Sequence, residues 1–163
     1  MTFKTSLDDL AKALTITASV IFTFAVAGQM ILFNAGEPII ATIVTVLLLL
    51  VYLRSYLLSP LGYEVTHNEI IIHRRLRDII LKRGDIANIE LADDNRLKHA
   101  VRILGVGGFF GYFGRYFNRE MGVMTWYATR RNKTVLISTH NNKKIVLTPD
   151  CPRKFLNSFV PTH

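Results

Sequence analysis

The sequence has very little of what catalytic and metal sites are built from. It contains a single cysteine, Cys151, so no disulfide can form within the chain, which fits a reducing compartment. Its five histidines show no H-x-x-x-H spacing, so no zinc site is written locally. A G-x-S-x-G elbow and a Gly-Lys-Ser/Thr phosphate loop are both absent. We therefore predict no enzyme activity, no metal and no cofactor.

Charge is missing from two long apolar stretches near the start of the chain. The first covers residues 13–33 and the second residues 38–58, and the only charged side chain in either is Arg54. Each stretch has close to the ~20 residues that a helix needs to cross the hydrocarbon layer of a bilayer. The sequence therefore predicts a transmembrane hairpin of two helices.

Basic residues give the expected orientation of this hairpin. Lys4 and Lys12 precede the first stretch, and the 17 Lys/Arg and 9 Asp/Glu of residues 60–163 account for the whole net charge of +8. The short turn between the stretches has no basic residue, and basic segments tend to stay in the cytoplasm. We predict that both termini are cytoplasmic. The expected divisions are a cytoplasmic N-terminal segment, 1–12, the hairpin, 13–58, and one small cytoplasmic domain, 59–163.

Two features of these stretches allow other interpretations, namely cleavage of a signal peptide and a role in transport. Residues 25–27, Ala-Val-Ala, have the small-x-small form of a signal-peptidase site, although the apolar run continues past them. If the chain were cleaved there, the second stretch would still return it to the cytoplasm.

In a transport role, Gln29 and Arg54 would be the residues of the pathway. We expect instead that Gln29 bonds to the neighbouring helix and that Arg54 reaches the inner interface.

Past Pro60 the period of the apolar residues changes from that of a helix to that of strands. Near the end, Pro152 fits a first helical turn, and Phe155 and Phe159 share one face of a helix. The expected fold class is α+β, mainly β: an antiparallel barrel or sandwich covered at one end or seam by a C-terminal helix. The seven predicted strands are 63–66, 69–74, 79–82, 86–91, 124–129, 134–139 and 144–148.

The order of these features resembles the bacterial pleckstrin-homology (PH)-like domains, from about residue 61 to residue 159. The resemblance implies a seven-stranded PH-like β-barrel of two nearly orthogonal sheets, capped by the C-terminal helix, behind two helices in the inner membrane of a bacterial cell. It brings no catalytic motif. The segments that carry the resemblance are 63–72, 74–76, 84–90, 104–114, 127–129 and 147–150, with Phe155.

Five glycines fall within residues 105–114, and aromatic residues lie between and after them, up to position 117. This composition is unlike that of a plain strand or helix. It also fails the G-x-G-x-x-G pattern, because position 110 is phenylalanine. In one interpretation the glycines make a sharp bend and the aromatic rings fill the barrel core. In the other, Phe109 and Phe110 dip into the membrane interface while Arg115 and Arg119 meet lipid headgroups.

Basic residues gather in the predicted turns. In the PH fold, loops at one end of the barrel carry the charges that bind phosphoinositides, so the resemblance implies anionic lipid as a ligand; a solvated turn surface is the alternative. The candidate contacts are Arg74, Arg75, Arg77, Lys82, Arg83, Phe109, Phe110, Arg115 and Arg119.

Together these features predict a membrane-tethered binding or scaffolding module. Its expected ligand is either anionic lipid or a partner protein, including a second copy of the chain, and we expect no nucleic-acid binding because no known module for it is present. The alternative function is that of an accessory component in a transport or envelope-stress system, acting through the two helices.

Overall fold

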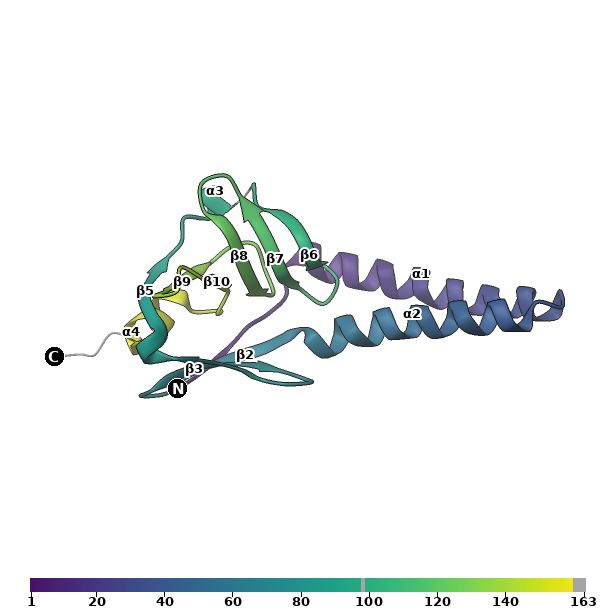
Figure 1. The fold of residues 1–163 in the computed structure, drawn as a ribbon, viewed down its shortest axis with the longest axis horizontal. Coiled ribbons are helices and arrows are strands. Elements are labelled where there is room, and N and C mark those ends of the chain that lie inside the picture. Colours follow the sequence, from purple (N-terminus) through teal and green to yellow (C-terminus); the bar gives the residue numbers. More distant parts are fainter. Residues whose placement is uncertain (98, 160–163) are drawn as a thin grey trace.

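A computed structural model describes residues 1–97 and 99–159, and Figure 1 shows a long helical hairpin that extends from a two-sheet domain. The helices are α1 (Asp9–Asn34), α2 (Pro38–Leu58), α3 (Asp94–Leu97) and α4 (Pro152–Phe159), with the 3-10 turn η1 (Arg83–Asp85). The strands are β1 (Thr2–Lys4), β2 (Pro60–Val65), β3 (Glu69–Arg74), β4 (Ile79–Lys82), β5 (Ile86–Leu91), β6 (Val101–Gly107), β7 (Tyr112–Asn118), β8 (Gly122–Ala128), β9 (Val135–Thr139) and β10 (Lys144–Leu147).

The hairpin has clear local reasons for where its helices begin and end. The side chain of Asp8 accepts a hydrogen bond from the Ala11 amide at 2.7 Å and so caps α1. Between the helices, Gly36 takes a positive φ of 90°, and Pro38 then opens α2. Both helices are long and apolar enough to cross a membrane, and most of their large apolar side chains are exposed. The helix α2 has the predicted bounds, and α1 begins four residues earlier than predicted.

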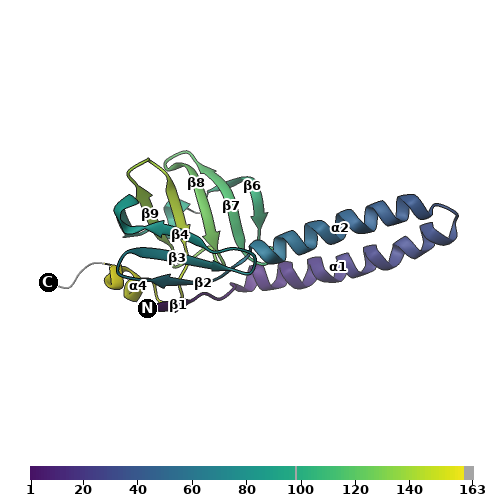
Figure 2. The same cartoon turned by 60° about the horizontal axis from the view of Figure 1, so that its bottom comes forward.

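The N-terminal residues form part of a sheet. Strand β1 pairs antiparallel with β2, with Phe3 opposite Tyr63 and Lys4 opposite Gly62. The helical hairpin is thus inserted between two neighbouring strands of one sheet, as Figure 2 shows. This strand was not predicted, because three residues before a polar segment give too short a pattern to recognise.

The strands form two open sheets, so the predicted closed barrel of seven strands is wrong in closure and in strand count. The described chain has ten strands, in the orders β1-β2-β3-β4 and β5-β9-β10-β8-β7-β6. The expectation of antiparallel strands also needs a correction, because β10 lies between β9 and β8 and runs parallel to β8. The chain runs from β8 to β9 and leaves one strand position between them, and β10 returns antiparallel to β9 to fill that position beside β8.

Two of the strands that sequence reasoning missed, β6 and β7, lie in the glycine-rich block. Gly105 and Gly114 face each other across this strand pair with φ values of +124° and +121°. A Cβ on Gly105 would overlap the Phe113 carbonyl and lie 2.7 Å from the Cα of Gly114. Gly105 and Gly114 therefore allow the backbones of the two strands to approach closely. Only residues 108–111, between β6 and β7, form a turn. The block, expected to be neither a plain strand nor a plain helix, thus consists of two strands with positive-φ glycines and of the turn between them.

One hydrophobic core lies between the two sheets, and α4 packs against it. Phe155 is fully buried, and its ring meets those of Phe3 and Tyr63 edge-to-face at 5.2 and 6.1 Å. The Tyr63 hydroxyl donates to the Tyr127 carbonyl at 2.6 Å and accepts from the Thr148 amide at 3.1 Å. These bonds link the two sheets, and burial raises the pKa of Tyr63.

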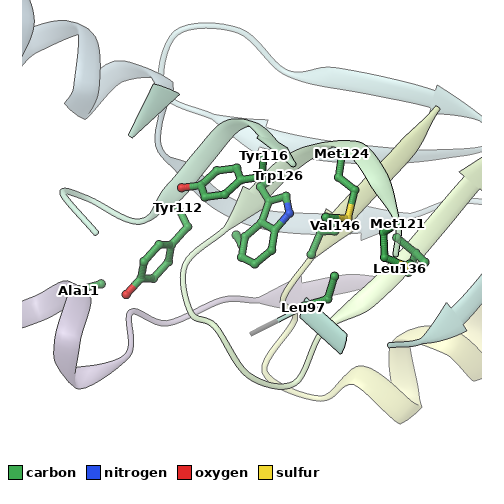
Figure 3. Packing of buried hydrophobic residues seen from close by; sticks show 10 residues of the cluster. Ala11, Leu97, Tyr112, Tyr116, Met121, Met124, Trp126, Leu136 and Val146 are labelled. Atoms are coloured by element: carbon green, nitrogen blue, oxygen red, sulfur yellow. The ribbon is translucent and has the colours of Figure 1, made fainter. Parts of the chain in front are cut away.

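A second core lies on the other face of the six-stranded sheet and extends to the first turn of α1. Figure 3 shows Tyr116 beside Trp126; the two rings are stacked with centroids 4.6 Å apart. Tyr112 lies near Ala11, which is fully buried, and burial raises the pKa of both Tyr112 and Tyr116 to about 12. The base of the hairpin is therefore packed into the domain.

Candidate binding site at the junction of hairpin and sheets

Residues 108–111, which we call the junction turn, pack against both helices of the hairpin. The rings of Phe109 and Phe110 meet the ring of Tyr52 edge-to-face at 5.4 and 5.5 Å. Phe110 also meets Tyr56 at 5.3 Å. The two phenylalanines thus belong to neither core cluster, and they lie against α2 instead of filling a barrel.

Hydrogen bonds hold the junction turn on α1. The Phe110 amide donates to the Thr15 hydroxyl at 2.9 Å, and that hydroxyl donates to the Ala11 carbonyl at 2.7 Å. Gly108 has a φ of +106°, which L side chains rarely adopt, and a Cβ there would meet the end of the Leu14 side chain, so glycine suits this contact with α1. The hairpin and the domain are therefore in contact along the junction turn and not only through their covalent connections.

Residues 75–78, which we call the basic turn, lie against the end of α2. The guanidinium of Arg75 lies 4.1 Å from the ring centroid of Tyr56 and donates to the Ser59 hydroxyl at 2.6 Å. The Leu76 amide donates to the Leu57 carbonyl at 3.1 Å, while the Leu76 side chain is exposed. The basic turn therefore presents positive charge beside the base of the hairpin.

A histidine between two carboxylates stabilises the basic turn. His73 Nδ1 lies 2.8 Å from Asp78 Oδ2, and its Nε2 lies 3.2 Å from Glu64 Oε2. The bond to Asp78 raises the pKa of His73, partly offset by burial and aided by Glu64. The pKa of Asp78 is lowered, first by the Arg74 amide and then by His73. Within residues 1–97 and 99–159, no group of three His, Cys, Asp or Glu side chains is placed to hold a metal ion.

Three arginines line one cavity of about 540 Å³ between α2 and the two sheets, which we call the arginine cavity. Arg54 comes from α2, Arg74 from β3 and Arg115 from β7. No acidic side chain lines the cavity, and no described carboxylate forms an ion pair with these three guanidinium groups. The remaining lining residues are Val51, Ser55, Leu58, Leu104, Gly105, Val106, Phe113, Gly114, Thr125 and Tyr127.

A second cavity of about 480 Å³ continues from the first, since the two share Arg115, Thr125 and Tyr127. Lys143 and Lys144 line it as well, with Ile79 and Leu81 among its apolar residues. The inner face of the six-stranded sheet therefore carries a basic groove with apolar walls beyond the arginine cavity.

The predicted contact residues fall into two groups. Arg74, Arg75, Arg77, Phe109, Phe110 and Arg115 lie in the junction turn, the basic turn or the arginine cavity. Lys82, Arg83 and Arg119 lie elsewhere: Arg83 donates to the Phe159 carbonyl and covers the Phe159 ring, and Arg119 follows β7 at the end opposite the junction turn. The sequence singles out Arg54 as the one charge in the two apolar stretches but gives no sign that it shares a cavity with two strand arginines.

The fold and the site define a small two-sheet binding domain joined to an apolar helical hairpin. A family model described as Bacterial PH domain matches residues 61–160, more than half of the chain, and the chain belongs to this family, as the resemblance predicted. PH domains are a non-catalytic binding fold that generally takes lipids or proteins. Searches of curated proteins and of solved structures return no match.

Proposed function

We propose that this protein is a membrane-tethered, non-catalytic binding module that recognises anionic lipid headgroups at the cytoplasmic face of the bacterial inner membrane. The hairpin, residues 13–58, anchors it, and the PH domain follows. The observation that carries the proposal is the arginine cavity beside α2, which is lined by three arginines that form no ion pair with any carboxylate the structure describes. Several positive charges around one cavity attract an anion, and a bilayer surface supplies anions in excess.

The length of α2 supports the proposal that this cavity lies at the depth of the lipid headgroups. The 21 residues of α2 correspond to about 31 Å of helix, close to the ~30 Å of bilayer hydrocarbon. The last turns of α2, which carry Tyr52, Arg54 and Tyr56, then lie at the membrane interface. Aromatic rings are enriched at that depth, and the rings of Phe109 and Phe110 join them there.

The pairing of β1 with β2 supports a common side for both ends of the hairpin, since two paired strands cannot lie on opposite sides of a bilayer. The basic domain favours the cytoplasm. We test the side with the single, exposed cysteine, Cys151, and a membrane-impermeant maleimide on spheroplasts. We expect no labelling of Cys151 and full labelling of a C151S/N34C variant at the hairpin tip; the reverse pattern would contradict the orientation.

A second candidate ligand is a partner protein, and the edge strand β6 supports it. Val101, Ile103 and Leu104 on this strand are exposed, and β6 has a neighbour on one side only. An edge of this kind can accept a strand from another chain, including a second copy. Co-purification of a defined partner that is lost on changing Ile103 to proline would support this candidate.

The alternative of a role in transport would rest on the hairpin itself. The Gln29 Nε2 atom donates to the Ala25 carbonyl of the same helix at 3.2 Å, so the expected bond to the neighbouring helix is wrong. Its Oε1 atom is buried and has no hydrogen-bond partner among the described residues, and Gln29 lines a cavity of about 420 Å³ between the two helices. Substitution Q29L separates this role from lipid binding, because we expect it to leave the response to lipid unchanged.

Lipid recognition is tested with the full chain in nanodiscs of neutral phosphatidylcholine. Trp126 is the only tryptophan and is buried, so its fluorescence reports unfolding. When part of the phosphatidylcholine is replaced with phosphatidylglycerol, the unfolding temperature should rise. The expected rise is about 2–4 °C for each kcal/mol by which phosphatidylglycerol binds the folded chain in preference to the unfolded chain. An unchanged midpoint at low salt would contradict the proposed function.

A further inference from the structure

The arginine cavity has a composition that narrows the kind of lipid it fits. It combines three arginines, no lining carboxylate, and apolar walls that continue onto the exposed surface of α2 and β6. We infer that it binds one lipid molecule whose headgroup is a phosphomonoester or a diphosphate, with the phosphate oxygens on Arg54, Arg74 and Arg115 and the hydrocarbon chain along α2. This inference rests on the proposed function and names the ligand class of its site.

Charge balance is the first argument for this ligand class. Asp78 lies close enough to Arg74 for the Arg74 charge to help lower the pKa of its carboxyl, so Arg54 and Arg115 are the two guanidinium groups left without a carboxylate. A phosphodiester lipid such as phosphatidylglycerol carries one negative charge and would compensate only one of these two. A phosphomonoester carries up to two negative charges and a diphosphate up to three. Guanidinium groups bind phosphate oxygens through paired hydrogen bonds, and a group with more terminal oxygens can meet more than one arginine at once.

The position of the arginines is the second argument. The side chains of Arg115 and Arg54 are exposed, and neither forms a hydrogen bond or ion pair with any other residue that the structure describes. Arg74 is held in place, because its Nε donates to the Arg77 carbonyl at 2.8 Å, and its Cζ lies 5.9 Å from the ring centroid of Tyr127. The cavity thus has one positioned guanidinium and two that can turn toward a ligand.

The apolar walls are the third argument, and they favour a lipid over a free phosphate compound. Val51 on α2 and Leu104 on β6 both line the cavity and are 64% and 69% exposed. At the depth proposed above, these side chains lie against the acyl region of the inner leaflet. A chain attached to a phosphate in the cavity can therefore leave sideways along α2 without crossing polar surface.

The cavity is a joint product of the hairpin and the domain. Arg54, Ser55 and Leu58 come from the hairpin, whereas Arg74 and Arg115 come from different sheets. The junction turn holds these parts together through Thr15 and Tyr52. A bound phosphate would bridge them, so the ligand should stabilise the whole molecule and not only the domain.

The ligand class is tested in the same nanodiscs by titrating dioleoyl phosphatidic acid, farnesyl diphosphate and, at matched surface charge, phosphatidylglycerol. We expect the first two to raise the unfolding midpoint at about tenfold lower mole fraction than phosphatidylglycerol. If phosphatidylglycerol acts as strongly, the inference is wrong while the proposed function stands; if none of the three has an effect, both are wrong. Inorganic diphosphate is the soluble probe, and equal stabilisation by it would show a free phosphate ligand and overturn the lipid part.

The site is tested by R115Q and R54Q, with K82Q and R119Q as charge-matched controls outside the cavity. We expect either cavity variant to weaken the response to phosphatidic acid about tenfold or more, while the control variants respond as the unchanged chain does. The midpoint in neutral lipid identifies any variant that is simply misfolded. An equal loss in K82Q or R119Q would show that only overall charge matters and would overturn the inference.

Discussion

The two ends of the two-sheet domain carry similar residues but present them differently. At the hairpin end, Arg74 and Arg115 face a cavity without acidic residues, and the rings of Phe109 and Phe110 contact α2. At the opposite end, the guanidinium of Arg83 covers the Phe159 ring and bonds the end of α4. The comparison teaches that a basic or aromatic turn acquires its role from the element that packs beside it, and that α2 is this element.

The largest effect is expected where the backbones of β6 and β7 meet. In G105A, the added Cβ overlaps the facing strand at a φ of +124°, so we expect a loss of about 3–5 kcal/mol in the free energy of unfolding. In G84A, at the opposite end, nothing lies within 4 Å of the new Cβ, and we expect a change within about 1 kcal/mol. Denaturation followed by Trp126 fluorescence measures both; similar losses would remove the contrast between the two ends.

An intermediate effect is expected from the aromatic contacts of the junction turn. The double variant F109S/F110S should cost about 2–4 kcal/mol, because it removes three edge-to-face contacts with Tyr52 and Tyr56. We expect hydrogen exchange to show lost protection at the Phe110 amide and retained protection in β8.

The matched control for that variant is F117S, since Phe117 is 43% exposed on β7. It should cost less than about 1 kcal/mol. If F109S/F110S unfolds as a whole, the result would instead support the interpretation that the rings of Phe109 and Phe110 belong to the core.

The smallest effect is expected from pH, through His73. Its pKa is raised in the folded chain by Asp78 and Glu64, so its contribution is fully present below the unfolded pKa of about 6.5 and is lost as pH rises through the folded pKa. Stability should therefore fall gently as pH rises through that range, and H73Q should remove this slope. A slope that H73Q leaves unchanged would assign the dependence to other groups.

Sequence patterns predicted those parts of the fold that rest on local chemistry. The apolar runs and Pro38 gave both helices of the hairpin, and alternation gave β3, β4 and β5 closely. They missed β6 and β7, because Gly105 and Gly114 favour strands only when they face each other, which is a relation between positions nine residues apart. They gave no sign that Arg54 and Arg115 line one cavity, because that cavity forms only when α2 is held beside the strands by the junction turn and the basic turn, far from both residues in the sequence.

The insertion of the hairpin between β1 and β2 has a consequence for biosynthesis. Strand β1 precedes its pairing partner β2 by nearly sixty residues, so it can join the sheet only after the whole hairpin between them has been synthesised. In the membrane arrangement proposed above, that strand pair can close only when both ends of the hairpin have reached the same side of the bilayer. The domain is also tied at two points instead of one, so it cannot swivel about a single linker as a domain on one flexible tether does.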